Sequence, residues 1–141
     1  MYYDSLMEDT PRLSKAEKEM IVVATSNINS CNYCLASHGA LLRIYSKNPL
    51  LGDQVAVNHK HADISDRQKK MLDFAVVVAQ GKPICDSQMV DMKESGFSDD
   101  EVWDIGSIAA FFALSNRMAH LTSMRPNDEF YLLGRLPKEK K

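Results

Sequence analysis

Residues 13–42 read LSKAEKEMIVVATSNINSCNYCLASHGALL and hold two helix-forming segments with one short break between them. Ser14 followed by Glu17 has the spacing of a capping box, in which the two side chains satisfy N–H groups that a helix start leaves unpaired. We therefore predict a helix over about 14–28. The letters NINS interrupt it, and a second helix is expected over about 31–45. Together they predict an antiparallel helical hairpin.

Helix punctuation continues along the rest of the chain. Capping signals, glycines and prolines predict further helices over about 49–58, 65–80, 86–96 and 98–123. No segment alternates polar and apolar residues with hairpin chemistry at its ends, so strands are not expected. The length of 141 residues suits one core. We predict an all-α bundle of about six helices that forms a single domain over 1–141, with the hairpin carrying the functional site.

Composition narrows the function classes. The net charge of −2 comes from 17 basic and 19 acidic residues, with no basic stripe besides the short tail KEKK. This balance argues against nucleic acid and anionic membranes as partners. The N-terminus is acidic and has no secretory signal, and the most apolar stretch, IGSIAAFFALSN, is too short to span a bilayer. The expected location is the cytoplasm.

Three cysteines occur, Cys31, Cys34 and Cys85, an odd number in a chain without an export signal. A structural disulfide framework is therefore the wrong model. In a reducing compartment a Cys-x-x-Cys pair is more often catalytic, redox-active or metal-binding. Cys85 is expected to be a small buried hydrophobe or an incidental thiol rather than a redox partner.

Cys31, Cys34 and His38 fall on one narrow face of the second predicted helix, because each residue turns it by about 100°. Ser30 can cap that helix, which would place Cys31 in its first turn, where the dipole favours a thiolate. Lowering a thiol pKa by 1.5 units needs about 2 kcal/mol, and a helix terminus supplies about 0.3–1 kcal/mol. His38, one turn from Cys34, can provide the remainder by accepting the thiol proton.

In the predicted hairpin, Glu19 and His38 lie at a similar distance from the break between the two helices. Glu19 lies about 16 Å from the break and His38 about 12 Å, at roughly 1.5 Å per residue. A carboxylate at that height could fix the imidazole tautomer and raise its basicity. The alternative for Glu19 is a solvated surface acid.

These residues carry a family resemblance. Glu19, Cys31-Asn32-Tyr33-Cys34 and His38 resemble the active-site pattern of the alkylhydroperoxidase D-like (AhpD-like) proteins in the carboxymuconolactone decarboxylase superfamily. The stretches SDRQKKMLDFA and SGFSDDEVWDIGSIAAFFALSNRMA extend the resemblance to its peroxidase-related branch. One departure is Asn32, which stands where the best-known relatives carry a second histidine.

The resemblance implies an all-helical homo-oligomer that reduces a small hydroperoxide without metal or flavin, using a dithiol reductant or thiol-redox protein as electron donor. It implies that Cys34 attacks the peroxide, that Cys31 resolves it by closing a disulfide, and that Glu19 and His38 relay protons. The spacing of Cys34 and His38 supports their pairing. The helix dipole and exposure instead favour Cys31 as the attacking thiol.

Three other interpretations remain open at this stage. Zinc could be held by the two cysteines and His38, with a fourth ligand from Cys85, His59, His61 or Glu19. The protein could be a helical module that senses redox state through a reversible disulfide, or a member of the lactone decarboxylase branch. Asn116-Arg117 resembles a family signature, and we expect it to form a structural ion pair.

Overall fold

Capping boxes set the starts of three long helices. α2 (Lys15–Ile28), α5 (Asp66–Ala79) and α7 (Asp99–Leu121) each follow a serine whose oxygen accepts the N–H three residues on. The side chain of that later residue returns a hydrogen bond to the serine N–H. These reciprocal pairs confirm the first signal that the sequence gave for a helical fold.

The computed structural model describes residues 2–8 and 10–136, and throughout these ranges all regular elements are helices. The all-α prediction is confirmed, and the six predicted helices correspond to α2 through α7. Two short terminal helices were not predicted. Besides α2, α5 and α7, the elements are α1 (Tyr2–Met7), α3 (Asn32–Ser46), α4 (Leu51–Asn58), the 3₁₀ helix η1 (His59–His61), α6 (Asp86–Glu94) and α8 (Asp128–Leu132).

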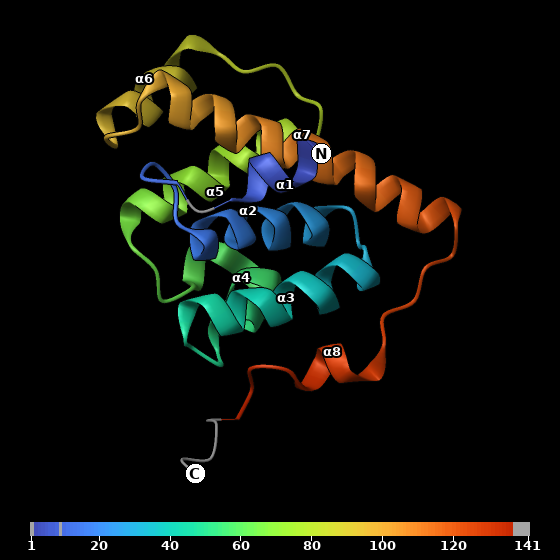
Figure 1. The fold of residues 1–141 in the computed structure, drawn as a ribbon. Coiled ribbons are helices and arrows are strands. Elements are labelled where there is room, and N and C mark those ends of the chain that lie inside the picture. The colour runs from blue at the N-terminus through green and yellow to red at the C-terminus, as the bar shows by residue number, and fades with distance from the viewer. Residues whose placement is uncertain (1, 9, 137–141) are drawn as a thin grey trace.

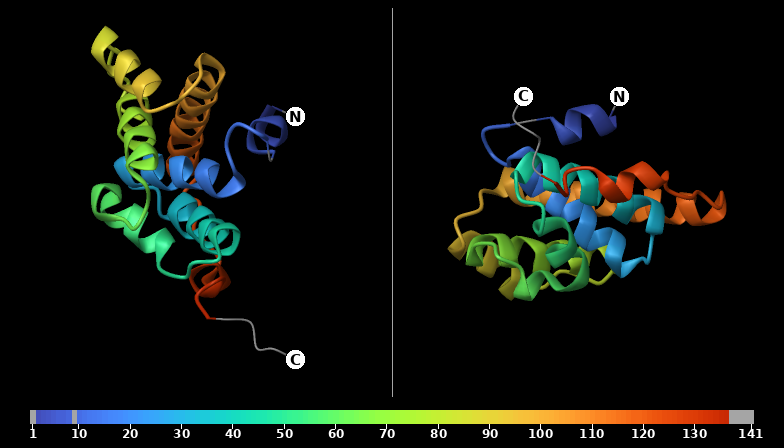
Figure 2. Two further views of the ribbon diagram at one scale, coloured as in Figure 1. Left: turned by 90° about the vertical axis from the view of Figure 1, so that its left-hand side faces the viewer. Right: turned by 90° about the horizontal axis from the view of Figure 1, so that it is seen from below.

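α2 is the centre of the molecule. It packs against α3, α4, α5 and α7, and its residues 18–26 are all buried. In Figure 1 it runs between α7 above and α3 below, and Figure 2 shows the other helices around it. A helix that is covered on every side must satisfy any polar group it carries, since burial without a partner is costly. Glu19 and Ser26 are therefore placed where they need hydrogen-bond partners.

The turn between α2 and α3 differs in detail from the prediction. Ser30 does not cap α3: its φ of 52° lies in the left-handed region, and its N–H donates to the Asn27 carbonyl. The next N–H, of Cys31, donates to the Ser26 carbonyl. These two bonds form a Schellman motif that closes α2. Cys31 consequently becomes the N-cap of α3.

α7 is buried on one face only. Its inward residues include Ile105, Ile108 and Phe112, whereas Trp103 and Leu114 on the outward side are 76% and 57% exposed. Apolar residues on all sides of the middle of this helix predict instead that it is buried all round, within this chain or by a partner. Among the residues that the structure describes, α7 and the other helices are too short or too polar to cross a membrane.

α8 lies beneath α3 (Figure 1), where Arg43 binds it. The buried guanidinium of Arg43 donates to the carbonyls of Leu133 and Phe130, at 2.8 and 3.0 Å. Burial lowers the pKa of Arg43. Gly134 follows with a φ of 74°, and a Cβ there would lie 2.9 Å from the Arg43 Cβ. The close approach of α8 to α3 therefore requires glycine at this position.

Replacing Arg43 tests how α8 is held. Arg43→Met removes both donors and leaves two carbonyls in a part-buried setting unpaired, so we expect the free energy of unfolding to fall by about 2 kcal/mol. Chymotrypsin should also cleave faster after Tyr131, because α8 is then no longer held against α3. Urea unfolding and timed proteolysis measure the two effects. Arg12→Met, which removes an exposed ion pair with Asp104, should cost less than about 1 kcal/mol. Equal losses for both variants would contradict this role of Arg43.

Candidate active site

The two cysteines of the CxxC motif meet at the start of α3. Their sulfurs lie 2.8 Å apart, and both are free thiols that are buried. The Cys31 sulfur also accepts the N–H of Cys34 at 3.4 Å, as an N-cap side chain does. Closing a disulfide requires the sulfurs to approach by roughly 0.8 Å, given a bond of about 2.05 Å. The predicted pairing of these side chains is thus present in the fold.

Glu19 reaches across from α2 to His38 on α3. Glu19 Oε2 lies 2.7 Å from His38 Nδ1, and the glutamate side chain is only 4% exposed. The imidazole packs edge-on against Phe112, with ring centroids 4.9 Å apart. The alternative of a solvated surface acid is therefore wrong for Glu19. The hairpin brings together these two residues, as their heights along the helices predicted.

The Glu19 contact has a consequence for the histidine ring. A carboxylate can only accept hydrogen bonds, so with Glu19 ionised His38 carries its hydrogen on Nδ1. In the neutral ring Nε2 is then the basic nitrogen. Within residues 2–8 and 10–136 no hydrogen bond joins His38 to either cysteine sulfur. A direct hydrogen bond through which His38 could accept the Cys34 proton is therefore not made in this arrangement.

A buried polar network lies on the other side of Cys34. Asn116, fully buried on α7, donates through Nδ2 to the Ser26 hydroxyl and accepts through Oδ1 from Asn29 Nδ2, both at 3.0 Å. His120 Nε2 donates to the Asn29 carbonyl at 2.8 Å. The expected ion pair at 116–117 is wrong, because Arg117 donates to the Ala113 carbonyl instead. An asparagine among the apolar residues of α7 was the sequence signal for this network.

Cys34 is held in its neutral form. Burial raises its pKa from the ordinary 9.0 to about 12, and hydrogen bonding and charge from Cys31 add to the rise. Hydrogen bonding from Asn116 and Ser26 acts in the opposite direction and lowers it. A thiol with that pKa is ionised in roughly one molecule in 10⁵ at pH 7. Reaction at Cys34 therefore requires a base.

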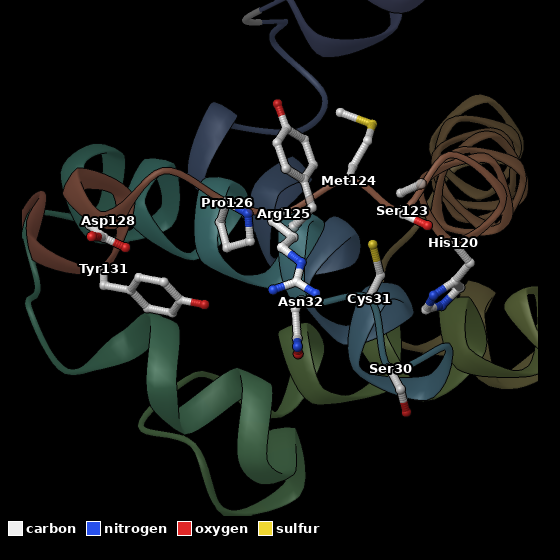
Figure 3. A pocket seen from close by; sticks show the side chains of 12 residues that line it. Ser30, Cys31, Asn32, His120, Ser123, Met124, Arg125, Pro126, Asp128 and Tyr131 are labelled. Carbon is white, nitrogen blue, oxygen red and sulfur yellow. The ribbon is translucent and has the colours of Figure 1, made fainter.

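A cavity of about 610 Å³ opens in front of Cys31. Its walls come from the start of α3, the end of α7 and the segment that leads into α8 (Figure 3). Cys34 is not part of this lining, so the two sulfurs differ in their access to the cavity. The lining residues are Ser30, Cys31, Asn32, Tyr33, Ala119, His120, Ser123, Met124, Arg125, Pro126, Asp128 and Tyr131.

The remaining candidate residues lie apart from this site. Cys85 is exposed at the N-cap of α6, so the alternative of a buried hydrophobe is wrong. His59 pairs with Asp73 at 2.7 Å, and His61 ends η1. Across the described ranges no group of three or more histidine, cysteine, aspartate or glutamate side chains could hold a metal ion. The residues proposed as zinc ligands are thus not assembled.

Comparison with solved structures places this geometry in a known class. The chain is 54% identical to the alkylhydroperoxidase AhpD core, an uncharacterized peroxidase-related protein, from Ralstonia eutropha JMP134, with a TM-score of 0.93. The alignment covers 97% of this chain and 73% of that one. An uncharacterized peroxidase-related protein from Silicibacter sp. TM1040 is 40% identical, with a TM-score of 0.90 over 94% of this chain and 70% of the other.

Residues 2–49, which include the whole CxxC motif, match the model of the carboxymuconolactone decarboxylase family. Curated proteins give no match. The chain belongs to the carboxymuconolactone decarboxylase family, as an AhpD-like, peroxidase-related member. The resemblance read from the sequence is confirmed at this level, and it supports an alkylhydroperoxidase-type function.

The pKa values of Cys85 and Cys34 should differ from the ordinary thiol value of 9.0 in opposite directions. Hydrogen bonds from Ser87 and the Gln88 backbone lower the pKa of Cys85, whereas that of Cys34 is raised to about 12. Alkylation by iodoacetamide requires the thiolate. We expect the Cys85 rate to level off at a lower pH than it does in unfolded protein, and the Cys34 rate still to rise about tenfold per unit at pH 10. Peptide mapping by mass spectrometry measures both rates in one sample.

Unfolded protein in urea supplies the reference for this experiment, because both cysteines should then titrate alike. A Cys34 rate that reaches its plateau near pH 7 in the folded protein would contradict the assigned environment.

Proposed function

We propose that the protein is a thiol-dependent hydroperoxidase that works through a dithiol–disulfide cycle at Cys31 and Cys34. The observation that carries this proposal is the pair of sulfurs 2.8 Å apart beside a buried Glu19–His38 pair. An attacking thiol needs a base and a nearby resolving thiol. The family membership supports the same class of reaction. The four residues in these roles are Glu19, Cys31, Cys34 and His38.

Cys34 is the proposed attacking thiol because the activating groups lie around it. His38 follows one helical turn later, and Asn116 and Ser26 favour the thiolate. Burial and Cys31 oppose ionisation, so the proton must leave Cys34 as the bond to peroxide oxygen forms. The Nε2 atom of His38 is the proposed acceptor, with Glu19 stabilising the charged ring. Since no hydrogen bond joins His38 to Cys34, a side-chain rotation or an intervening water must complete the path.

The proposed chemistry balances as follows. The Cys34 sulfur attacks the distal oxygen of ROOH, the O–O bond breaks, and ROH leaves with the proton that His38 returns. Cys34 is then a sulfenic acid. Cys31 attacks that sulfur, which forms the disulfide and releases water. An external dithiol reduces the disulfide and becomes a disulfide itself. This cycle requires a reducing compartment, for which we propose the cytoplasm.

Single substitutions test the cycle. With dithiothreitol as reductant and cumene hydroperoxide as substrate, we expect Cys34→Ser, Cys31→Ser and His38→Ala each to lose at least about a hundredfold in turnover. Glu19→Gln should lose about tenfold or more, because the ring loses its anionic partner. In Cys31→Ser, dimedone should trap a sulfenic acid on Cys34, since no resolving thiol remains. Cys85→Ser serves as the matched control and should keep full turnover.

Three results would count against this proposal. A number of free thiols that is unchanged after one equivalent of hydroperoxide would contradict the proposed peroxidase activity. One oxidation per protein without turnover, when dithiol is in excess, would indicate a redox sensor. A dimedone adduct on Cys31 in Cys34→Ser, with none on Cys34 in Cys31→Ser, would reverse the roles of the two thiols.

We further propose that copies of the chain associate through the outward face of α7. Four large apolar side chains lie exposed on this helix, an arrangement typical of an interaction surface. They are Trp103, Leu114, Met118 and Leu121. A second copy can bury the same stripe in a symmetric contact.

Leu114→Lys tests this assembly, because the charge would be buried in the contact. We expect the wild type to elute as an oligomer, and the variant to shift to a smaller mass with unchanged helical circular dichroism. Multi-angle light scattering gives the masses. Val57→Lys, at an 82% exposed site on α4, is the control. A monomeric wild type would overturn the proposal.

A further inference from the structure

The cavity in front of Cys31 contains an arginine that has no partner among the described residues. All six arginines of the chain lie in the described ranges, and the other five donate hydrogen bonds to carboxylates or carbonyl oxygens. Arg125 alone makes no hydrogen bond or ion pair with any described residue. Figure 3 shows its guanidinium in the middle of the cavity, between Tyr131 and Cys31.

Neutral hydrogen-bonding groups surround this guanidinium. The Tyr131 and Ser123 hydroxyls line the same cavity, and either can donate to an anion. Their side chains come from α8 and from the loop after α7, whereas Cys31 belongs to α3. Because Arg43 ties α8 to α3, the wall that carries Tyr131 stays opposite the reactive sulfur. The cavity volume is in the range that holds small ligands.

The charges of the lining limit the kind of anion that fits. Asp128 adds one negative charge, and Figure 3 shows it on the far side of Tyr131 from Cys31. One guanidinium opposed by one carboxylate gives little net attraction for a dianion such as a phosphate monoester. A guanidinium presents two parallel N–H groups, which match a carboxylate. A monoanionic carboxylate is therefore the ligand that this lining fits best.

We propose that Arg125 forms a subsite for the carboxylate of a small organic molecule that reacts at Cys31. This inference rests on the proposed function. The molecule is accordingly either an organic hydroperoxide or a thiol reductant, and in both cases it bears a carboxylate. Both sources present the same anionic group to Arg125 while their reactive atom meets the sulfur. In the thiol case, the reductant thiolate attacks the Cys31 sulfur of the disulfide, Cys34 leaves as the thiol after taking a proton, and a mixed disulfide forms. A second reductant thiol then releases Cys31.

The first measurement does not depend on peroxidase activity. The Cys31–Cys34 disulfide is formed with diamide, and its reduction is timed with 3-mercaptopropionate and with the neutral 3-mercaptopropanamide, at equal thiolate concentrations. The second measurement compares the turnover of linoleic acid hydroperoxide with that of its methyl ester. We expect the acid to react about fivefold faster in at least one pair. The pair that shows the difference identifies the source of the carboxylate.

Variants assign the preference to Arg125. Arg125→Gln should bring the acid down to the rate of its neutral counterpart, and Arg125→Lys should keep part of the preference. Asp128→Asn should increase it, since a repelling charge is removed. Lys93→Gln removes one positive charge from α6, which Figure 1 shows on the opposite side of the molecule from α8. This control should keep the full preference.

The outcomes separate this inference from the proposed function. Equal rates for acid and neutral reagent in the wild type, or a preference that survives Arg125→Gln, would overturn the subsite. If the wild type reduces no hydroperoxide, the proposed function fails, and the thiol pair alone then decides on the subsite.

Discussion

The three-residue break between α2 and α3, residues 29–31, determines the geometry of the candidate site. The Schellman motif that closes α2 uses the N–H groups of Ser30 and Cys31, so the chain reverses within a few residues and Cys31 begins the next helix. This reversal places the CxxC sulfurs beside the turn that joins the two helices of the hairpin. It also lays α3 along α2 so that Glu19 meets His38 at 2.7 Å. A longer or looser connection would allow the helices to slide, and the acid and imidazole would no longer come to the same height.

Much of this architecture could be predicted from the sequence because it depends on local signals. The capping serines and the spacing from Glu19 to His38 define helix starts and heights without knowledge of the tertiary fold. The helix rise alone brought Glu19 to His38, while its burial could not be foreseen, because that depends on α2 being covered on all sides. α8 was missed for a related reason. Its five residues have no capping bond from the Asn127 side chain, and long-range bonds from Arg43 hold it in place.

Sequence reasoning missed the polar network of the site because it joins α7 to the distant end of α2. Asn116 and His120 are about 90 residues away from Ser26 and Asn29 along the chain, and no local pattern connects them. The apolar neighbours of Asn116 suggested only a core helix, although a buried amide in such a helix needs partners. Cys85 shows the opposite error. A cysteine is usually buried when it is free, but here it caps a surface helix and is exposed.

Burial of Cys34 has two opposing effects, because it shields the thiol and also disfavours the thiolate. The same desolvation that shields the thiol raises its pKa to about 12, so at neutral pH a solvent-exposed cysteine such as Cys85 is the more ionised of the two. A buried thiol gains selectivity in exchange, because it reacts only when a base and a peroxide are both aligned with it. Asn116 and Ser26 offset part of the cost of ionisation, and the Glu19–His38 pair is positioned to accept the proton. Cys31 lines the cavity, whereas Cys34 does not. In the proposed cycle the two sulfurs would therefore have separate roles: Cys34 would be a protected attacking thiol, and Cys31 would be the thiol that external molecules reach.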